Sequence, residues 1–386
     1  MSGSGDDSMS LRTKLAAYFL YLMQDTPHHG IDIPILKVLE WASMAYKKGV
    51  AATYNSYRKN PQKQVKLPAK VISLGNITVG GTGKTPTACL LARYLQQKGL
   101  RTALLNRGYR SETEGKAAIM SDGEHILLTA AAGGDEACLM ARSLPGIPVL
   151  VGRNRGSSGQ LAVDMFHSQV LLLDDGFQHW QLYRDLDIVL IDGTNPFGNG
   201  YVLPRGILRE PLEQLRRAGL IIITKADLAT EQQRESIYAA LHTYHPHVPV
   251  AEAVHRPKWC ISFADWNSFK KRADCACLAE DQPVIAVSAL GNPASFEATI
   301  QTFGYTIADT MRYDDHYQYS RDDLTAMAKK AQEQGAVLVT TEKDAVKMDA
   351  EYITAHDIPL YVLGIEIEII KGNTDVENVL AQVIGG

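Results

Sequence analysis

The chain has 386 residues, of which 45% are hydrophobic and 21% are charged, and its formal net charge is −4. A chain of this length is expected to form about two globular domains, and its nearly balanced charge gives no overall attraction to nucleic acid, so we expect no nucleic-acid partner. The five cysteines include no pair of CxxC units, and their odd number argues against a disulfide framework and favours a reducing cytoplasm.

The N-terminal region predicts two helices and a basic segment. Residues 1–10 are polar and carry no signal-peptide pattern, and apolar residues recur at helical spacing over 11–23 and 35–48. Neither stretch is long enough to span a bilayer. Residues 41–70 contain seven basic side chains and no acidic one. This pattern favours docking on an anionic membrane, and the alternative is an ordinary helix packed on the core beside a solvated basic loop.

A glycine-rich loop follows an apolar run at 71–74 and precedes a helical pattern that ends near Gly99. Strand, loop and helix in this order are typical of a phosphate-binding loop, although Thr78 replaces the usual first glycine. Lys84 can reach the β- and γ-phosphates, and the hydroxyl of Thr85 can bind Mg²⁺. We therefore predict that a nucleotide binds to Thr78, Val79, Gly80, Gly81, Thr82, Gly83, Lys84 and Thr85.

Apolar runs then alternate with helical segments, at 102–105, 147–151, 170–173, 188–191 and 220–223. This alternation predicts an α/β fold with a parallel sheet covered on both faces, whose ligands bind at the carboxyl ends of the strands. The run at 170–173 leads into Asp174 and Asp175, a Walker B pattern that delivers a carboxylate to Mg²⁺. Residues 224–227 resemble the guanine-reading element of GTPases, but only three fixed residues are involved and we assign them no such role.

The regular alternation lapses between residues 245 and 282, which predicts a first domain over 1–250 and a smaller α/β domain over 251–386. The second domain is expected to have strands near 284–287, 305–308, 336–340 and 360–364. Its main helix should begin at a capping box of Ser320 and Asp323 and end at Gly335. Cys275 and Cys277 lack two further ligands at metal-site spacing, so we interpret them as incidental thiols.

Taken together, the motifs resemble the tetraacyldisaccharide 4′-kinase family over residues 35–350. The resemblance is carried in chain order by residues 75–86, 107–109, 134–137, 174–179, 196–200, 203–206, 208–211, 315–316 and 341–347. The threonine form of the phosphate-binding loop is this family's own.

The resemblance implies a kinase that transfers the γ-phosphate of ATP, with Mg²⁺, to the 4′-hydroxyl of tetraacyldisaccharide 1-phosphate and so forms lipid IVA in lipid A biosynthesis. It also implies a P-loop NTPase-like domain, a second α/β domain joined by a two-stranded linker, and an N-terminal amphipathic helix that docks on the membrane. The implied location is the cytoplasmic face of the inner membrane of a Gram-negative bacterium. The implied partners are the lipid disaccharide and the anionic membrane surface, with no obligate protein partner.

Roles for single residues follow from the same resemblance. Lys84, Asp135 and His316 would be catalytic, with Asp135 as the general base supported by His316 from the second domain. Thr85, Asp174 and Asp175 would hold the metal. The nucleotide and sugar-phosphate cleft would be lined by Tyr109, Glu136, Arg155, Gln178, His179, Arg209 and Glu210. The alternative function is a P-loop GTPase or ATPase that acts as a switch or metallochaperone, which residues 224–227 and the Cys-x-Cys favour slightly.

Overall fold

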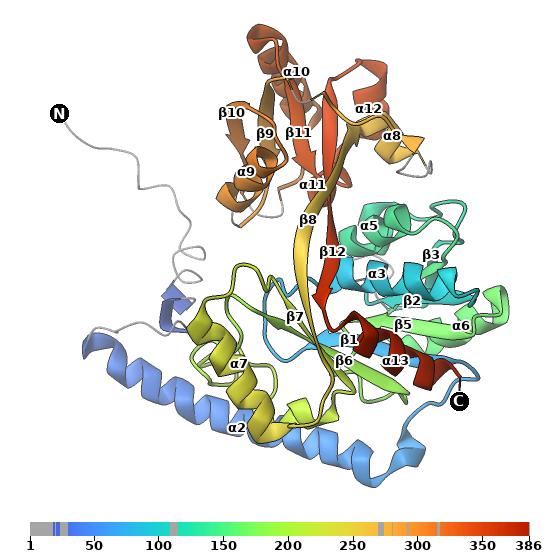
Figure 1. Cartoon of the computed structure of the whole chain (residues 1–386), viewed down its shortest axis with the longest axis vertical. Coiled ribbons are helices and arrows are strands. Elements are labelled where there is room, and N and C mark those ends of the chain that lie inside the picture. Colours follow the sequence, from blue (N-terminus) through green and yellow to red (C-terminus); the bar gives the residue numbers. More distant parts are fainter. Residues whose placement is uncertain are drawn as a thin grey trace.

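The computed structural model describes residues 18–19, 21–23, 30–108, 115–268, 274–279, 281–291, 293–314 and 317–385. In this part of the chain the strands form one continuous sheet that runs through two α/β bodies and the linker between them (Figure 1). The first body contains β1 (Lys70–Asn76), β2 (Thr102–Asn106), β3 (Ala118–Ser121), β4 (Val149–Val151), β5 (Val170–Asp174), β6 (Leu186–Asp192) and β7 (Leu220–Thr224).

The sheet of the first body has the order β3-β4-β2-β5-β1-β6-β7, and only β3 runs antiparallel to its neighbour. On β1, Ile72 packs into one hydrophobic cluster and Val71 into another. Both faces of the strand are therefore buried, which explains why its sequence is a continuous apolar run. Helices of this body are α3 (Lys84–Gln97), α4 (Ala130–Gly133), α5 (Asp135–Ser143), α6 (Arg155–Phe166) and α7 (Glu231–Tyr244). The predicted parallel sheet is confirmed.

Two long antiparallel strands, β8 (Val250–Ser262) and β12 (Leu360–Lys371), connect the bodies. Where the indole of Trp259 lies against β12, a Cβ on Gly364 would overlap the ring, so this position requires glycine. After β12 the helix α13 (Asn373–Ile384) returns to the first body, where Val376 and Leu380 join the core. The domain boundary at residue 250 stays a prediction, but these last residues pack with the first body.

The second body is built on β9 (Val284–Ser288), β10 (Ile307–Arg312) and β11 (Val337–Thr341), with helices α8 (Phe263–Asn267), α9 (Pro293–Thr302), α10 (Arg321–Gln334), α11 (Glu342–Ala345) and α12 (Ala350–Ala355). The capping box of Ser320 and Asp323 and the left-handed Gly335 are present at the ends of α10. The strand expected at 305–308 begins later, at Ile307. Tyr305 is instead a buried core residue whose hydroxyl donates to the carbonyl of Leu278, at 2.9 Å.

Helix α2 (Ile33–Lys59) lies along the outside of the first body (Figure 1). It is longer than the expected 35–48, because nothing interrupts the helix until Asn60, whose position before Pro61 disfavours helical backbone. The helix expected at 11–23 falls mostly outside the described residues. No helix in the described ranges has the length and apolar character needed to cross a membrane.

Candidate active site

The phosphate-binding loop leaves β1 at Asn76 and enters α3 at Lys84. The amide of Asn76 donates to the hydroxyl of Thr82 at 3.0 Å, and the hydroxyl of Thr224 donates to the carbonyl of Thr82 at 3.1 Å. Gly83 adopts a φ of 75°, and a Cβ there would lie 3.1 Å from Nε2 of His255 on β8. The loop is therefore anchored by strand ends on both sides, and the linker packs directly against its last glycine.

Lys84 projects from this loop toward the carboxyl end of β5. Its Nζ lies 3.5 Å from Oδ1 of Asn76 and 3.7 Å from Oδ1 of Asp175. The side chain is 16% exposed. Contacts this long leave the ammonium able to move onto a phosphate, and Thr85 follows Lys84 in the first turn of α3, where the helix N-terminus favours anions.

Asp174 ends β5 in a fully buried position. Its Oδ2 accepts a hydrogen bond from the amide of Asn106 at 3.0 Å, and its Oδ1 has no partner among the described residues. Burial raises the pKa of Asp174 to about 7, and the neighbouring charges of Glu136 and Asp175 act in the same direction. A buried carboxylate oxygen without a donor is costly, and a cation is the ligand that would relieve that cost.

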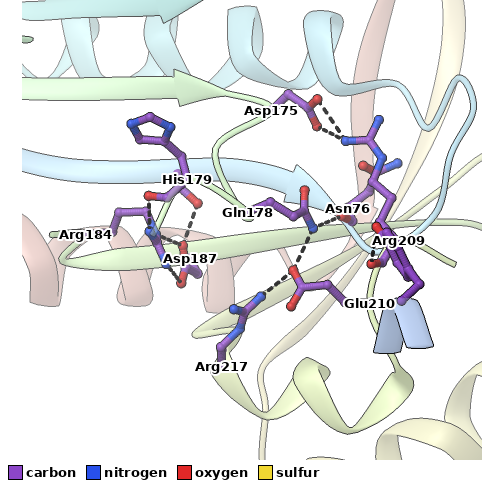
Figure 2. Close-up of polar contacts among 11 residues, drawn as sticks. Asn76, Asp175, Gln178, His179, Arg184, Asp187, Arg209, Glu210 and Arg217 are labelled. Carbon is purple, nitrogen blue, oxygen red and sulfur yellow. Dashed lines mark hydrogen bonds and ion pairs between the residues drawn. The ribbon is translucent and has the colours of Figure 1, made fainter. Parts of the chain in front are cut away.

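Asp175 lies one residue further, in a left-handed conformation with a φ of 53°. Nη1 of Arg209 contacts its two carboxylate oxygens at 2.8 and 2.9 Å (Figure 2). Burial would raise the pKa of Asp175, but the charges of Lys84 and Arg209 outweigh it and hold the pKa below its ordinary value. The two adjacent aspartates therefore differ, because burial dominates at Asp174 and two cations dominate at Asp175.

Glu210 follows Arg209 and is completely buried. Its Oε1 accepts from Nε2 of Gln178 at 2.8 Å and from Nη2 of Arg217 at 2.9 Å. Gln178 also donates to the carbonyl of Asn76 at 3.0 Å, so this network reaches the start of the phosphate-binding loop (Figure 2). Burial raises the pKa of Glu210, although Arg217 and Gln178 act against that rise.

His179 and Arg155 border the same region. Burial lowers the pKa of His179 to about 4, and the charges of Arg155, Arg184 and Arg107 add to the effect. Arg155 begins α6 in a buried position, and Asn154 caps that helix by accepting from two backbone N–H groups. The histidine is therefore neutral at physiological pH and can serve as a hydrogen-bonding group rather than as a cation.

Asp135 and Glu136 occupy the first turn of α5, after Gly134 in an N-cap position that makes no side-chain cap. The negative charge of Glu136 contributes to the raised pKa of Asp174. The predicted site residues Tyr109 and His316 lie outside the described residues. The structure therefore brings the predicted residues of the phosphate-binding loop, β5 and the 209–210 segment together, and the pairing of Asp135 with His316 stays a prediction.

A cavity of about 270 Å³ opens beside the phosphate-binding loop, between the two bodies. Its walls come from α3, α5, both linker strands and the 341–343 segment, and include Thr85, Cys89, Ser143, Trp259 and Glu342.

The two elements that favoured a switch or metallochaperone are accounted for otherwise. Lys225 forms an ion pair with Asp192, whereas Asp227 makes only a long contact with Arg256, at 3.7 Å, so Lys225 of the guanine-reading pattern is engaged within the protein. Cys277 is exposed, and the described residues contain no group of three or more His, Cys, Asp or Glu side chains that could hold a metal ion.

Several site residues were not identified from the sequence. Asn76 and Asn106 each end a strand of the parallel sheet and orient Thr82 and Asp174, respectively. Their position directly after apolar runs was the available signal. Arg217 had no such signal, because it lies in the short 3₁₀ helix Leu212–Arg217 and reaches the site only through Glu210.

Comparisons with known proteins identify relatives of this chain. A family model described as Tetraacyldisaccharide-1-P 4′-kinase matches residues 35–385. A tetraacyldisaccharide 4′-kinase of Halothermothrix orenii is 38% identical over 384 residues, covering 97% of this chain and 98% of its own. One of Syntrophus aciditrophicus is 38% identical over 343 residues, covering 87% and 90%. The crystal structure of LpxK from Aquifex aeolicus in complex with ATP superimposes with a TM-score of 0.73 at 27% identity, covering 91% of this chain and 99% of that one.

Proposed function

The chain belongs to the tetraacyldisaccharide-1-phosphate 4′-kinase family, and from this premise we propose how its residues divide the work of phosphoryl transfer. The reaction carries the γ-phosphate of ATP to the 4′-hydroxyl of a tetraacyldisaccharide 1-phosphate in lipid A biosynthesis. Such a transfer requires the protein mainly to position two substrates and to neutralise phosphate oxygens.

The phosphates of ATP would lie on the loop between Asn76 and Lys84. The loop is open around Gly80 and Gly81, because a Cβ added at either position would meet nothing within 4 Å. Lys84 would exchange its long contact with Asp175 for the β- and γ-phosphates, which agrees with its limited attachment in the structure.

The donor set beside this loop fits Mg²⁺. Asp174 offers a buried oxygen without a partner among the described residues, and Asp175 and the hydroxyl of Thr85 supply the hard oxygen ligands that this ion prefers. Bound there, Mg²⁺ would neutralise charge on the β- and γ-phosphate oxygens. Asn106, through its bond to Oδ2, orients Asp174 for that role.

The acceptor would approach from the side of Arg155, Gln178, His179 and Arg209. Asp135 would accept the proton of the 4′-hydroxyl, supported by His316 from the second domain. Asp135 lies in the first turn of α5, after the N-cap residue Gly134, on the same helix as Glu136, whose charge influences Asp174. Tyr109 and Glu136 would complete the cleft.

The adenine would occupy the cavity between the bodies. This cavity adjoins Thr85, whereas Lys225, at the position of a base-reading residue in GTPases, is here paired with Asp192. A Ser143→Trp variant, which fills the cavity from α5, should raise the KM for ATP, and ATP should be used in preference to GTP. A normal KM for ATP in this variant would place the base elsewhere.

Helix α2 would dock the enzyme on the cytoplasmic face of the inner membrane. Its outward side chains include Val38 at 67%, Trp41 at 74% and Met44 at 53% exposure, whereas Leu39 and Ser43 face the protein. Exposed apolar side chains in a row are costly in water, and Lys48, Arg58 and Lys59 on the same helix would attract anionic lipid.

The observation that carries this assignment is the convergence of Lys84, Asp174, Asp175 and Arg209 at the carboxyl ends of β1 and β5. The test is transfer of radiolabel from [γ-³²P]ATP to a tetraacyldisaccharide 1-phosphate in detergent. A labelled lipid supports the assignment. Release of free phosphate without a labelled lipid would favour the switch alternative instead.

A further inference from the structure

Arg217 is held in an aromatic cage contributed by distant parts of the chain. Its guanidinium carbon lies 3.9 Å from the ring centre of Phe177, 4.9 Å from that of Tyr54 and 5.8 Å from that of Trp180. The side chain is 8% exposed. Cation–π contacts of this kind strengthen when the cation is shielded from water, so the cage fixes the plane of the guanidinium.

The hydrogen bonds of Arg217 are few for so buried a cation. Nη2 donates to Glu210, while Nε and Nη1 have no hydrogen-bond partner among the described residues. The faces of the three aromatic rings therefore take the place of hydrogen-bond acceptors for Nε and Nη1. The remaining nitrogen, Nη2, donates to the carboxylate of Glu210, which is itself completely buried.

Glu210 links the fixed position of Arg217 to the position of Gln178. The carboxylate oxygen that accepts from Arg217 also accepts from Nε2 of Gln178, whose second acceptor is the carbonyl of Asn76 (Figure 2). Removal of the cation would leave a buried charge with only Gln178 and the charge of Arg184 to offset its burial, and a carboxylate in that state protonates or moves. In either case Gln178 loses its charged acceptor.

Helix α2 contributes to the same arrangement from the outside. Tyr54 supplies one ring of the cage, and the hydroxyl of Tyr46 donates to the carbonyl of Arg209 at 3.1 Å. The hydroxyl of Ser43 donates to the carbonyl of Val202 at 2.8 Å. The inner face of α2 is thus bonded along the segment that carries Arg209 and Glu210.

We propose that Arg217 is a positioning residue of the kinase: caged by Phe177, Trp180 and the α2 residue Tyr54, it holds Glu210 so that Gln178 is fixed at the acceptor side of the cleft. This rests on the proposed placement of the acceptor beside Gln178. Helix α2 then serves the reaction as a support for the site, separately from any contact of its outer face with lipid.

The experiment is a double-mutant cycle between Arg217 and Gln178, assayed with ATP and tetraacyldisaccharide 1-phosphate in detergent micelles. Arg217→Met should lower kcat/KM for the lipid by about 10- to 100-fold while the KM for ATP is unchanged, because misplacement of a positioning group costs rate at the acceptor. In a Gln178→Leu background the same substitution should cause no further loss. A purely structural arginine would lower activity by the same factor in both backgrounds.

Arg217→Lys keeps a positive charge beside Glu210 and completes the cycle if the methionine variant does not fold. Arg321→Met is the matched control, because Arg321 also pairs with a carboxylate, Asp349, and lies over a ring, Tyr352, but on the second body. It should leave both kinetic constants unchanged.

Equal losses in both backgrounds, or normal kinetics in every Arg217 variant, would overturn the proposal. The catalytic assignment is tested independently, since Lys84→Ala should abolish transfer whatever the cycle shows.

Discussion

Nη1 of Arg209 and Nζ of Lys84 approach the same carboxylate, that of Asp175, at 2.8 and 3.7 Å. One cation comes from the phosphate-binding loop and the other from the segment tied to α2. Asp175 therefore joins the nucleotide side of the site to the proposed acceptor side. Its left-handed backbone, with a φ of 53°, is tolerated by aspartate more readily than by most residues.

Arg209→Met should lower kcat by about 100-fold, because Asp175 loses its closest counter-charge and the cleft loses a group that can neutralise phosphate oxygens. The fold should persist, since the Arg209 side chain is 25% exposed. The measurements are steady-state kinetics and thermal unfolding followed by circular dichroism. Arg256→Met, which removes a looser cationic contact of Asp227, at 3.7 Å, is the control and should retain wild-type kcat. A normal kcat for Arg209→Met would remove Arg209 from the site.

Lys84→Ala should abolish transfer and leave the unfolding temperature nearly unchanged. The loop is shaped by its glycines and by Asn76 and Thr224, and the two contacts of Nζ, at 3.5 and 3.7 Å, are too long to stabilise the fold much. Lys98→Ala, at the other end of the same helix, should be active. Substantial turnover by folded Lys84→Ala would mean that this loop does not act in the transfer.

The sequence predicted best what depends on local pattern. The strands of the first body, the phosphate-binding loop and the α10 capping box follow from apolar runs, glycines and cap residues within a few positions of one another. The relative placement of Asp175 and Arg209 did not follow from local pattern. Asp175 is predicted from the Walker B pattern after an apolar run, whereas Arg209 is predicted as a site residue only through the family resemblance.

Contacts between distant segments could not be predicted. The cage around Arg217 joins α2 to the turn after β5. Helix α13, which follows the linker strand β12 in the chain, packs into the core of the first body. The polar 341–347 motif is also partly buried, although polar residues suggest an exposed segment. Asp344 is buried, accepts from Thr341 and the backbone of Ala289, and pairs with buried Lys347, so part of the motif is structural.

Helix α2 should bind anionic vesicles through its outward face. Val38→Ser with Trp41→Ser removes two side chains that are 67% and 74% exposed and should reduce recovery of the protein with anionic liposomes in flotation. Deletion of residues 1–48 should reduce it further, and salt should weaken what remains, since charge attraction is screened. Met165→Ser, a similarly exposed apolar residue on α6, should float like the wild type. Unchanged flotation of the double variant at low salt would mean that α2 has only a structural role.

His179 should make folding stability depend on pH. Its pKa is lowered by burial to about 4 in the folded protein, from an ordinary value near 6.5. Between these values the unfolded chain binds a proton that the folded protein does not, so stability falls as pH drops from about 6.5 to about 4. The loss is at most about 3 kcal/mol, given the size of the shift. His179→Gln should remove this dependence.

The check for His179 is urea unfolding of the wild type and His179→Gln at pH 7.5 and 4.5. The variant should lose less stability between the two pH values than the wild type. Equal losses would show that the folded histidine takes up its proton near the ordinary pKa and that its burial is not what the structure implies.

Asp135 should act as the general base, with His316 supporting it. Asp135 follows Gly134 in the first turn of α5, and Gly134, not Asp135, is the N-cap residue of that helix. Asp135→Asn preserves shape but cannot accept the hydroxyl proton, and general-base assistance is worth about 10² to 10⁴ in rate. We therefore expect kcat to fall by that factor while the KM for either substrate and the unfolding temperature change little. Asp164→Asn, on the exposed surface of α6, should be fully active.

The partnership with His316 is tested by the double variant. If the two residues accept the proton as one unit, Asp135→Asn with His316→Ala should be no slower than the poorer single variant, because removal of either residue already disables the unit. Losses that multiply would mean that the residues act independently, with His316 contributing elsewhere in the cleft. Normal kcat in Asp135→Asn would assign the proton to another acceptor, and Glu136, adjacent to it and close enough to influence Asp174, would be the next residue to substitute.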